Sequence, residues 1–379
     1  MSRIKLLVRL FCQRPSFTKP IQTEVVIFDE SLSDLITPLL AGHSYFVVKR
    51  RNLRLNIPIF IRSLRTGFSV SNYLIHLLRA MHPKLVLTLI DNDPAFYRIK
   101  QFVPNARHVA IQNGWRGITN DLFGKGFSLE DGLTCDEILV FGPAVAREYE
   151  KIVSARVLSI GSFKNNLVPI QHDPESKTIA LISTLRSKVD LKDIVQVSDS
   201  GRSIQFAEIF ERRLRLAEFC HEFCKREGFH LRILGKDAEI GREFAMYSER
   251  LGQPGDTWSF TPRSTLLANY PELDKARAVI SSSSSLGYEA LGRGCRAAFF
   301  MIDHEVLNDV GTNFGWPLQL PDRGDFWSHY LSREEVERVL THVVKSTDPV
   351  WRASSEEIAR ELISFEEGNT TLQKIIDSI

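Results

Sequence analysis

The sequence predicts an α/β protein of two Rossmann-like domains that face each other across a cleft. In both halves of the chain, short apolar runs alternate with helical patterns of about 10 to 15 residues, as in parallel βαβ units. A polar stretch at residues 162–177, which contains Pro169 and Pro174, separates the two halves. The residues after position 350 are largely helical. We therefore expect one domain over residues 1–165, a second over residues 166–350 and a terminal helical segment over residues 351–379.

In the N-terminal half, six runs have the β-branched and apolar composition of strands. They lie at residues 23–28, 45–48, 84–90, 107–111, 137–141 and 157–160. Apolar residues at helical spacing predict helices between these runs, with a bend near Pro38 and an end before Pro83. These helices lie at residues 31–40, 57–64, 71–81, 95–102 and 143–149. The alternation predicts a parallel sheet covered by helices.

The C-terminal half repeats this alternation. Its predicted strands lie at residues 178–182, 231–234, 258–260, 276–280 and 296–301. Its predicted helices lie at residues 204–226, 242–251, 264–273, 332–344 and 351–379. The third is expected to break near Pro271 and the last at Gly368 and Asn369. Ser332 has the position of an N-cap, and Glu334 and Glu335 occupy the first turn that follows. A second parallel α/β domain follows from this pattern.

Composition and charge exclude several classes of protein. The 43% hydrophobic and 25% charged content is ordinary for a globular chain, and a net charge of +2 gives no indication of a nucleic-acid partner. No GxGxxG follows the first strand, and no Walker loop or HExxH helix occurs, so dehydrogenase, ATPase and metalloprotease chemistry lack their motifs. No internal repeat indicates a solenoid.

The chain lacks a run of the roughly 20 apolar residues that cross a bilayer, so we expect a cytoplasmic protein. Residues 1–14 combine Arg3, Lys5, Arg9 and Arg14 with apolar residues. This segment either touches the inner membrane face peripherally or is a solvated terminus. Because Arg9 interrupts the apolar stretch and no cleavage site follows, it does not resemble a secretory signal.

The five cysteines are scattered and odd in number, which argues against a disulfide framework. Cys220, His221 and Cys224 could be metal ligands, but the two cysteines lie on the apolar stripe of a predicted helix. No second ligand pair follows at zinc spacing. We expect core cysteines and no bound metal.

Residues 281–294, SSSSSLGYEALGRG, form a predicted turn from a buried strand into a helix. Unpaired N–H groups and the helix dipole at such a turn can hold a phosphate or a nucleotide ribose. Gly287 would let a ligand approach the backbone, and Glu289 could accept hydrogen bonds from sugar hydroxyls. The alternative is that the serines only cap the helix.

This strand, turn and helix, followed by the apolar run at residues 296–301, resembles the donor-nucleotide loop of GT-B glycosyltransferases. The resemblance is strongest to those of bacterial surface-carbohydrate biosynthesis. It implies an N-terminal acceptor-side domain, a C-terminal nucleotide-sugar-binding domain and a terminal helix that crosses back onto the first domain. It also implies a nucleotide-sugar donor as substrate, no cofactor, and a glycan or lipid-linked acceptor. UDP-sugar 2-epimerases have a related turn on the same fold.

Ligands of open α/β sheets bind beyond the carboxyl ends of the strands, where polar clusters follow strands in both halves. In the C-terminal half, the residues expected to bind the donor are Ser183, Arg186, Lys236, Ser282, Ser283, Ser284, Ser285, Gly287 and Glu289. In the N-terminal half, those expected to bind the acceptor or the phosphate are Asn92, Gln112, Asn113 and Arg116. Arg186 and Lys236 would neutralise the donor phosphate, unless they are ordinary surface charges.

An inverting sugar transfer needs a base that takes the proton of the acceptor hydroxyl. Asp91 or Asp93 is the candidate, because both follow the strongest predicted strand of the first half. The alternative is that they cap the helix beginning at Pro94. No Asp-x-Asp motif of the metal-binding kind is present beyond this Asp-Asn-Asp sequence, which fits a metal-free site equally well.

The sequence thus predicts a glycosyltransferase that builds a surface glycan such as an O-antigen or a capsule. Two alternatives stay open. One is a UDP-sugar 2-epimerase, although the acidic and histidine residues that this family places around the sugar ring cannot be located as a full set. The other is a GT-B-like subunit without catalysis that binds a glycan or a partner enzyme.

Overall fold

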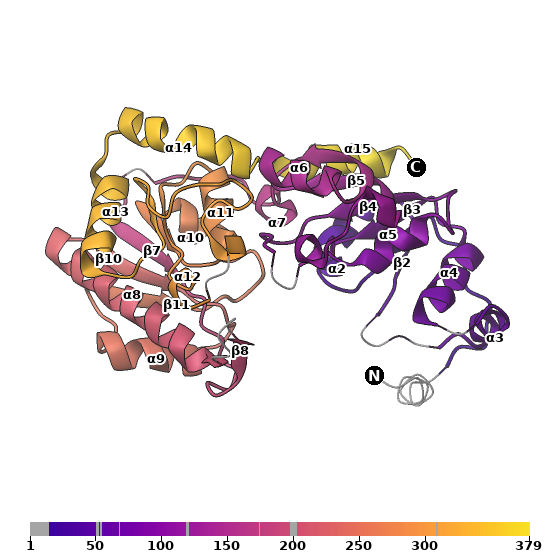
Figure 1. Cartoon of the computed structure of the whole chain (residues 1–379), viewed down its shortest axis with the longest axis horizontal. Coiled ribbons are helices and arrows are strands. Elements are labelled where there is room, and N and C mark those ends of the chain that lie inside the picture. The colour runs from indigo at the N-terminus through magenta and orange to yellow at the C-terminus, as the bar shows by residue number, and fades with distance from the viewer. Residues whose placement is uncertain are drawn as a thin grey trace.

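The computed structural model describes residues 15–50, 53, 55–67, 69–118, 121–173, 175–197, 203–307 and 310–379. They form two lobes, each built on a parallel six-stranded sheet (Figure 1). The basic segment at residues 1–14, considered above for membrane contact, lies outside the described residues.

The first sheet has the strand order β2-β1-β3-β4-β5-β6. Its strands are β1 (Val25–Ile27), β2 (Tyr45–Val47), β3 (Leu85–Thr88), β4 (Arg107–Ile111), β5 (Thr134–Val140) and β6 (Ser154–Ser159). The helices of this part of the chain are α2 (Ser33–Ile36), η1 (Thr37–Leu40), α3 (Ile57–Arg65), α4 (Val70–Met81), α5 (Pro94–Lys100), η2 (Leu122–Lys125), η3 (Leu129–Asp131), α6 (Pro143–Glu150) and α7 (Phe163–Asn166). Strands β1 and β3 are fully buried, as expected where helices cover both faces of a parallel sheet.

The second sheet has the order β11-β10-β7-β12-β13-β14. Its strands are β7 (Thr178–Ile182), β10 (His230–Leu234), β11 (Trp258–Thr261), β12 (Ala278–Ser281), β13 (Ala297–Phe300) and β14 (Trp327–Ser328), and β8 (Ile194–Val197) and β9 (Ser203–Gln205) form a separate antiparallel pair. The helices here are α8 (Phe206–Glu227), α9 (Arg242–Leu251), α10 (Tyr270–Asp274), α11 (Ser285–Gly292), α12 (His304–Leu307), η4 (Val310–Thr312) and α13 (Arg333–Lys345). The first strand of this sheet, β7, lies between β10 and β12, so the chain order reverses there.

The last helices are α14 (Asp348–Leu362), η5 (Glu367–Asn369) and α15 (Thr370–Asp377). Figure 1 shows α14 above the second lobe and α15 above the first. The side chains of Leu372, Ile375 and Ile376 are buried in one core cluster with Val25 and Ile27 of β1. The C-terminal helix therefore packs against the first sheet.

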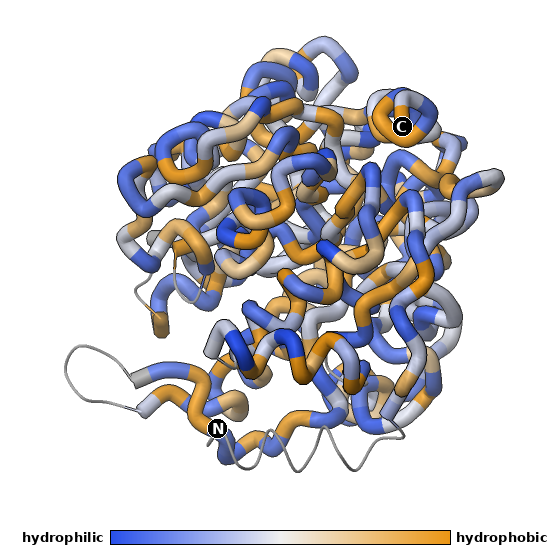
Figure 2. The backbone as a smooth tube through the Cα atoms, turned by 90° about the vertical axis from the view of Figure 1, so that its right-hand side faces the viewer, coloured by the Kyte–Doolittle hydropathy of each residue, from blue (hydrophilic) through white to orange (hydrophobic). Residues whose placement is uncertain are grey.

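The buried side chains of the helices show how the helices pack against the sheets. Figure 2 shows hydrophobic and hydrophilic residues interspersed along the chain. In the long helices α4, α8 and α13 the buried residues recur at helical spacing, which gives each of them an apolar face. Within α8, Cys220 and Cys224 are both fully buried in the core, and His221 lies 2.9 Å from the Thr257 hydroxyl through its Nε2 atom. These three residues pack the helix against its sheet. In the described part of the chain, no helix combines the length and the hydropathy that a membrane crossing requires.

Candidate functional site

A cavity of about 270 Å³ opens at the carboxyl ends of the second sheet, beside the first turn of α11. The strands β7, β10, β11 and β12 each deliver residues to it directly after they end. In chain order, these residues are Ser183, Thr184, Arg186, Gly235, Lys236, Arg263, Ser283, Ser284 and Ser285. The cavity thus lies where the strand order reverses, which is the usual ligand position in open α/β sheets.

Five cationic side chains line this cavity: Lys164, Arg186, Arg213, Lys236 and Arg263. Arg213 is neutralised by Asp303 at 2.5 Å. In contrast, Arg186, Lys236 and Arg263 form no ion pair with any residue that the structure describes. Burial lowers the pKa of Lys236, and the positive charges of Arg186, Arg213 and Arg263 lower it further. Such a concentration of positive charge fits a multiply charged anion such as a diphosphate.

Residues 281–285, here called the serine turn, carry five hydroxyls, of which only some line the cavity. Ser283, Ser284 and Ser285 line it, and Ser284 caps α11 by accepting a hydrogen bond from the backbone of Leu286 at 3.3 Å. Ser282 is buried instead, and its hydroxyl lies 3.3 Å from that of Thr184. The turn therefore combines capping with three hydroxyls at the cavity.

Gly287 does not line the cavity, which corrects the expectation that it brings a ligand close to the backbone. A Cβ at this position would lie 2.3 Å from the Ser281 hydroxyl oxygen and 2.4 Å from its Cβ, at the end of β12. The absence of a side chain lets α11 pack tightly against that strand.

Replacing Gly287 with alanine is expected to lower the free energy of unfolding by about 1–3 kcal/mol, because the new methyl group forces α11 away from β12. Gly255 is the matched control, since a Cβ there meets nothing within 4 Å. Urea denaturation of both variants measures the difference. Equal stability of the two variants would contradict this account of Gly287.

Glu289 lines the cavity but is already hydrogen-bonded within the protein. Its side chain is 1% exposed, and its carboxylate accepts hydrogen bonds from the hydroxyls of Ser162 and of Tyr270, the latter at 2.9 Å. Lys164 lies 3.7 Å away. Because Ser162 and Lys164 follow the last strand of the first sheet, Glu289 connects the two lobes at the cavity wall. The sequence-based expectation of a sugar-binding carboxylate did not include these partners.

Asn269 offers an unused acceptor at the same cavity. The residue is 5% exposed, and its Nδ2 donates to the Gly235 carbonyl at 3.3 Å. Its Oδ1 has no hydrogen-bond partner among the described residues. Buried polar atoms are nearly always paired, so this oxygen is an acceptor available to a ligand of the cavity.

On the N-terminal side, Asp91 is fully buried in an ion pair with Arg116. Its carboxylate accepts hydrogen bonds from Arg116 Nε at 2.7 Å, from the Asn113 backbone at 3.2 Å and from the Tyr149 hydroxyl. Although burial lowers the pKa of Arg116, the nearby charges, that of Asp91 foremost, raise it above its ordinary value. Asp91 is thus enclosed by protein groups, and its role as the base stays a prediction.

The other residues of this loop also bind one another. Gln112 is 1% exposed, donates to the Gly114 carbonyl at 2.9 Å and accepts from the Phe141 backbone at 2.8 Å. Asn113 accepts from Arg116 at 2.9 Å. These contacts fix the loop, and binding of the acceptor or phosphate by Gln112, Asn113 and Arg116 stays a prediction.

Asp93 keeps a more accessible position, with its side chain 19% exposed. It caps α5 by accepting from the Ala95 backbone at 3.0 Å and forms an ion pair with Arg50. Its neighbour Asn92 is half-buried. Of the two predicted candidates for the base, Asp93 is the one that solvent reaches.

An aromatic contact joins the two strand-end regions across the lobes. The ring of Trp115 stacks on that of Tyr288 with centroids 3.5 Å apart and planes 1° apart. The Trp115 backbone donates to the Ser285 hydroxyl at 2.7 Å. The loop that follows β4 therefore lies directly against the serine turn of the cavity.

Sequence reasoning missed several residues that line the cavity, among them Lys164, Arg213, Arg263 and Tyr270. Arg263 follows a strand as the predicted residues do, so its position could have identified it. Arg213 lies in the middle of α8, where nothing in the local sequence distinguishes it from other helical arginines.

Two facing parallel sheets, a cavity at the reversal point of the second and a C-terminal helix that packs against the first together define a GT-B fold. The family model described as "putative O-antigen biosynthesis protein" matches residues 109–378. The chain belongs to this family. Both findings confirm the resemblance to GT-B proteins of bacterial surface-carbohydrate biosynthesis that was drawn from the sequence. No protein of curated function matches the chain.

Among solved structures, one of the wall teichoic acid polymerase TagF is 10% identical, with a TM-score of 0.50, over 95% of this chain and 89% of that protein. A "putative UDP-N-acetylglucosamine 2-epimerase" of Listeria monocytogenes is 12% identical, with a TM-score of 0.49, over 93% and 95%. The pneumococcal O-GlcNAc transferase GtfA, solved with UDP and GlcNAc, is 10% identical, with a TM-score of 0.45. That match covers 82% of this chain, which spans only 60% of GtfA. At these identities the likeness concerns the fold alone.

Proposed function

We propose that the protein transfers a sugar from a nucleotide-activated donor to a growing surface glycan. The observation that supports this proposal most directly is the cationic cavity, where Arg186, Lys236 and Arg263 have no acidic partner among the described residues. The diphosphate of the donor would lie among these three side chains, next to the first turn of α11. Membership in the O-antigen biosynthesis family supports a glycan, free or lipid-linked, as the acceptor.

In such a transfer, negative charge develops on the departing nucleoside diphosphate. Fixed cations and oriented N–H groups that surround the leaving oxygen stabilise this charge in the transition state. Since Arg186, Lys236 and Arg263 form no ion pair with the described residues, we propose that they stabilise this charge in place of a metal. We place the reaction in the cytoplasm, and peripheral membrane contact through residues 1–14 stays part of the proposal.

The acceptor would enter from the first lobe, whose loop after β4 contacts the serine turn through Trp115 and Ser285. Asp93 is the proposed base for the acceptor hydroxyl, since its carboxylate is the accessible one of the Asp-Asn-Asp sequence. The ion pair with Arg50 and the cap of α5 hold this carboxylate in one position at the surface of the first lobe.

Replacing Asp93 with asparagine is expected to lower the turnover number about 100-fold, since a general base contributes at least that factor. Asparagine caps a helix as well as aspartate does, so α5 and the melting temperature should change little. Donor binding should also be unchanged, because Asp93 does not line the cavity. Turnover equal to that of the wild type would remove Asp93 from the mechanism.

A thermal-shift screen of the protein with UDP, GDP, CMP, CDP, ADP and dTDP tests the proposed function. A ligand that binds only the folded state raises the melting temperature, and the proposal predicts a selective rise with one base. That rise should be lost in Arg186→Ala and kept in Lys188→Ala, which removes the same charge from an exposed position outside the cavity.

Other outcomes of this screen favour the two alternatives. Absence of a shift with every nucleotide would favour the glycan-binding subunit over the transferase. Conversion of a UDP-sugar to its 2-epimer without any acceptor would favour the epimerase.

A further inference from the structure

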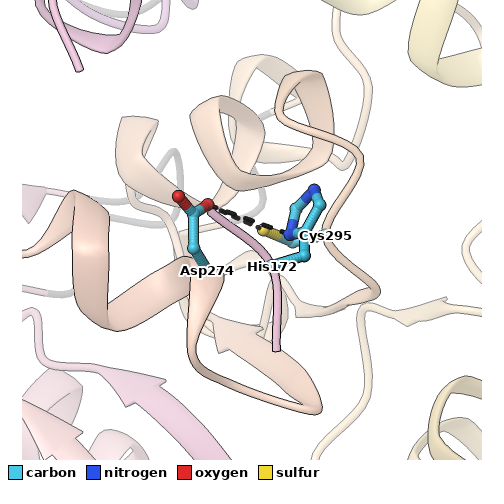
Figure 3. A group of neighbouring side chains, drawn as sticks. All are labelled: His172, Asp274 and Cys295. Carbon is cyan, nitrogen blue, oxygen red and sulfur yellow. Dashed lines mark hydrogen bonds and ion pairs between the residues drawn. The ribbon is translucent and has the colours of Figure 1, made fainter. Parts of the chain in front are cut away.

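A second group of reactive side chains lies at the opposite end of the second sheet from the cavity. His172 lies in the segment that joins the lobes, Asp274 ends α10 and Cys295 precedes β13 (Figure 3). Asp274 Oδ1 is 4.0 Å from His172 Nδ1 and 3.9 Å from Cys295 Sγ, and the three atoms all lie within 4.8 Å of one another. All three residues come before strands, so the group is outside the donor site.

The tautomer of His172 is set by its second ring nitrogen. His172 Nε2 lies 2.9 Å from the backbone carbonyl of Arg293. A carbonyl oxygen can only accept, so Nε2 bears the hydrogen and the neutral ring has its lone pair on Nδ1. This lone pair faces the Asp274 carboxylate, which is also an acceptor, at a distance too long for a hydrogen bond. A histidine that binds a metal commonly donates its other N–H to a carbonyl in this manner.

The other two side chains fit a cation at this point. Asp274 Oδ1 accepts one hydrogen bond from Arg293 Nε at 2.8 Å, and Oδ2 accepts one from the Gln171 backbone at 2.9 Å, so the carboxylate has a fixed direction and Oδ1 keeps a second lone pair. The Cys295 thiol has only long contacts, 3.8 Å to the Leu273 carbonyl and 3.9 Å to Asp274. A thiol with only such long contacts is available to a metal, which binds cysteine as the thiolate.

We propose that His172, Asp274 and Cys295 bind one zinc-like divalent ion through Nδ1, Oδ1 and Sγ. A point equidistant from the three atoms lies about 2.5 Å or less from each, and zinc bonds to these ligands measure about 2.0–2.3 Å. Movements of a few tenths of an ångström would therefore complete the site. The His172 side chain is 43% exposed, which leaves a path for the ion and room for water as the fourth ligand.

A second group of possible metal ligands consists of His304, Asp322 and His329. Its hydrogen bonds show that His329 is not available to a metal. The Phe314 backbone N–H donates to His329 Nε2 at 3.0 Å, so the hydrogen of the neutral ring is on Nδ1. That hydrogen points to Asp322 at 3.1 Å and completes a hydrogen bond. No lone pair of this ring is left for a metal.

The bound ion would attach the interlobe segment to the second lobe, because His172 lies in that segment and the other two ligands lie in the lobe. It would act on stability, not on the proposed sugar transfer. The expected consequence is a higher melting temperature with the metal than without it.

Cobalt titration of reduced, chelator-treated protein tests the site. One equivalent of Co²⁺ should give a thiolate-to-cobalt band in the near ultraviolet and visible bands of tetrahedral cobalt. The near-ultraviolet band should vanish in Cys295→Ala and persist in Cys135→Ala, where another buried thiol is removed. His172→Gln, at a partly exposed position, should weaken Co²⁺ binding more than about tenfold. Mutation of a residue that only hydrogen-bonds to a metal ligand already lowers metal affinity by about that factor.

Three results would overturn the proposal. They are the absence of a thiolate band in the wild type, a band that persists in Cys295→Ala, and unchanged Co²⁺ affinity in His172→Gln. Any of these would leave His172 as a neighbour of Asp274 and not as a metal ligand. The readout is spectroscopic and does not depend on whether the protein transfers sugars.

Discussion

Replacing Arg293 with methionine is expected to lower the free energy of unfolding by about 3–5 kcal/mol, because the change leaves a buried carboxylate without its cation. The Arg293 side chain is 0% exposed and that of Asp274 1%. Arg293 also donates to the carbonyls of Val168 and Pro169, both at 2.9 Å. Methionine fills similar volume but satisfies none of these acceptors, so the interlobe segment loses its attachment to the second lobe.

Urea denaturation of Arg293→Met measures this loss, with Arg360→Met as the control. Arg360 is an exposed helical arginine paired with Glu356, and removal of such a pair costs about 0.5 kcal/mol or less. Comparable stability of the two variants would show that the buried pair does not hold the segment in place.

Replacing Asp91 with asparagine should have a similarly large effect on stability, about 3–5 kcal/mol, because Arg116 is left as a buried cation without its main partner. The Tyr149 hydroxyl and the Asn113 backbone lose a charged acceptor as well. Nucleotide binding should survive, since Asp91 is not among the residues that line the cavity.

Denaturation and nucleotide binding together decide the role of Asp91. Lower stability with intact nucleotide binding is the expected pair of results. Wild-type stability without turnover would instead return Asp91 to the catalytic role that the sequence suggested.

The fold could be predicted because parallel strands buried on both faces appear as continuous apolar runs. The run at residues 84–90 became β3 (Leu85–Thr88), and the run at residues 178–182 became β7 (Thr178–Ile182). Elements formed by tertiary contacts were missed. Ile204, predicted to begin a helix, pairs with Gln196 in the β8–β9 hairpin, and the two-residue strand β14 (Trp327–Ser328) gave no signal of its own.

The helix predicted at residues 264–273 is confined to α10 (Tyr270–Asp274). The sequence suggested that Pro271 breaks this helix. Pro271 instead occupies one of its first two positions, where the missing N–H costs nothing. The predicted break near Pro271 is therefore a helix start.

The candidate site could be predicted only in part. A polar residue that follows a strand can bind a ligand or stabilise the fold, and the local sequence looks the same in both cases. Lys236 and Asp91 both follow strong strands, yet Lys236 lines the cavity while Asp91 is enclosed by Arg116 and Tyr149. Burial and partners, which depend on the whole fold, separate these two cases. Lys164 and Arg213 reach the cavity from helices, so strand ends could not reveal them.

The central claim is that the cationic cavity binds the diphosphate of a nucleotide donor. Isothermal titration calorimetry tests it with the nucleoside diphosphate that gives the largest thermal shift and with the matching nucleoside. The diphosphate should bind the wild type far more tightly than the nucleoside does. Lys236→Ala should lose about 10- to 150-fold in affinity, the equivalent of one charged hydrogen bond of about 1.5–3 kcal/mol, whereas Lys188→Ala should bind normally. Two results would contradict the claim. One is that Lys236→Ala binds the diphosphate as tightly as the wild type does. The other is that the wild type binds the nucleoside as tightly as the diphosphate.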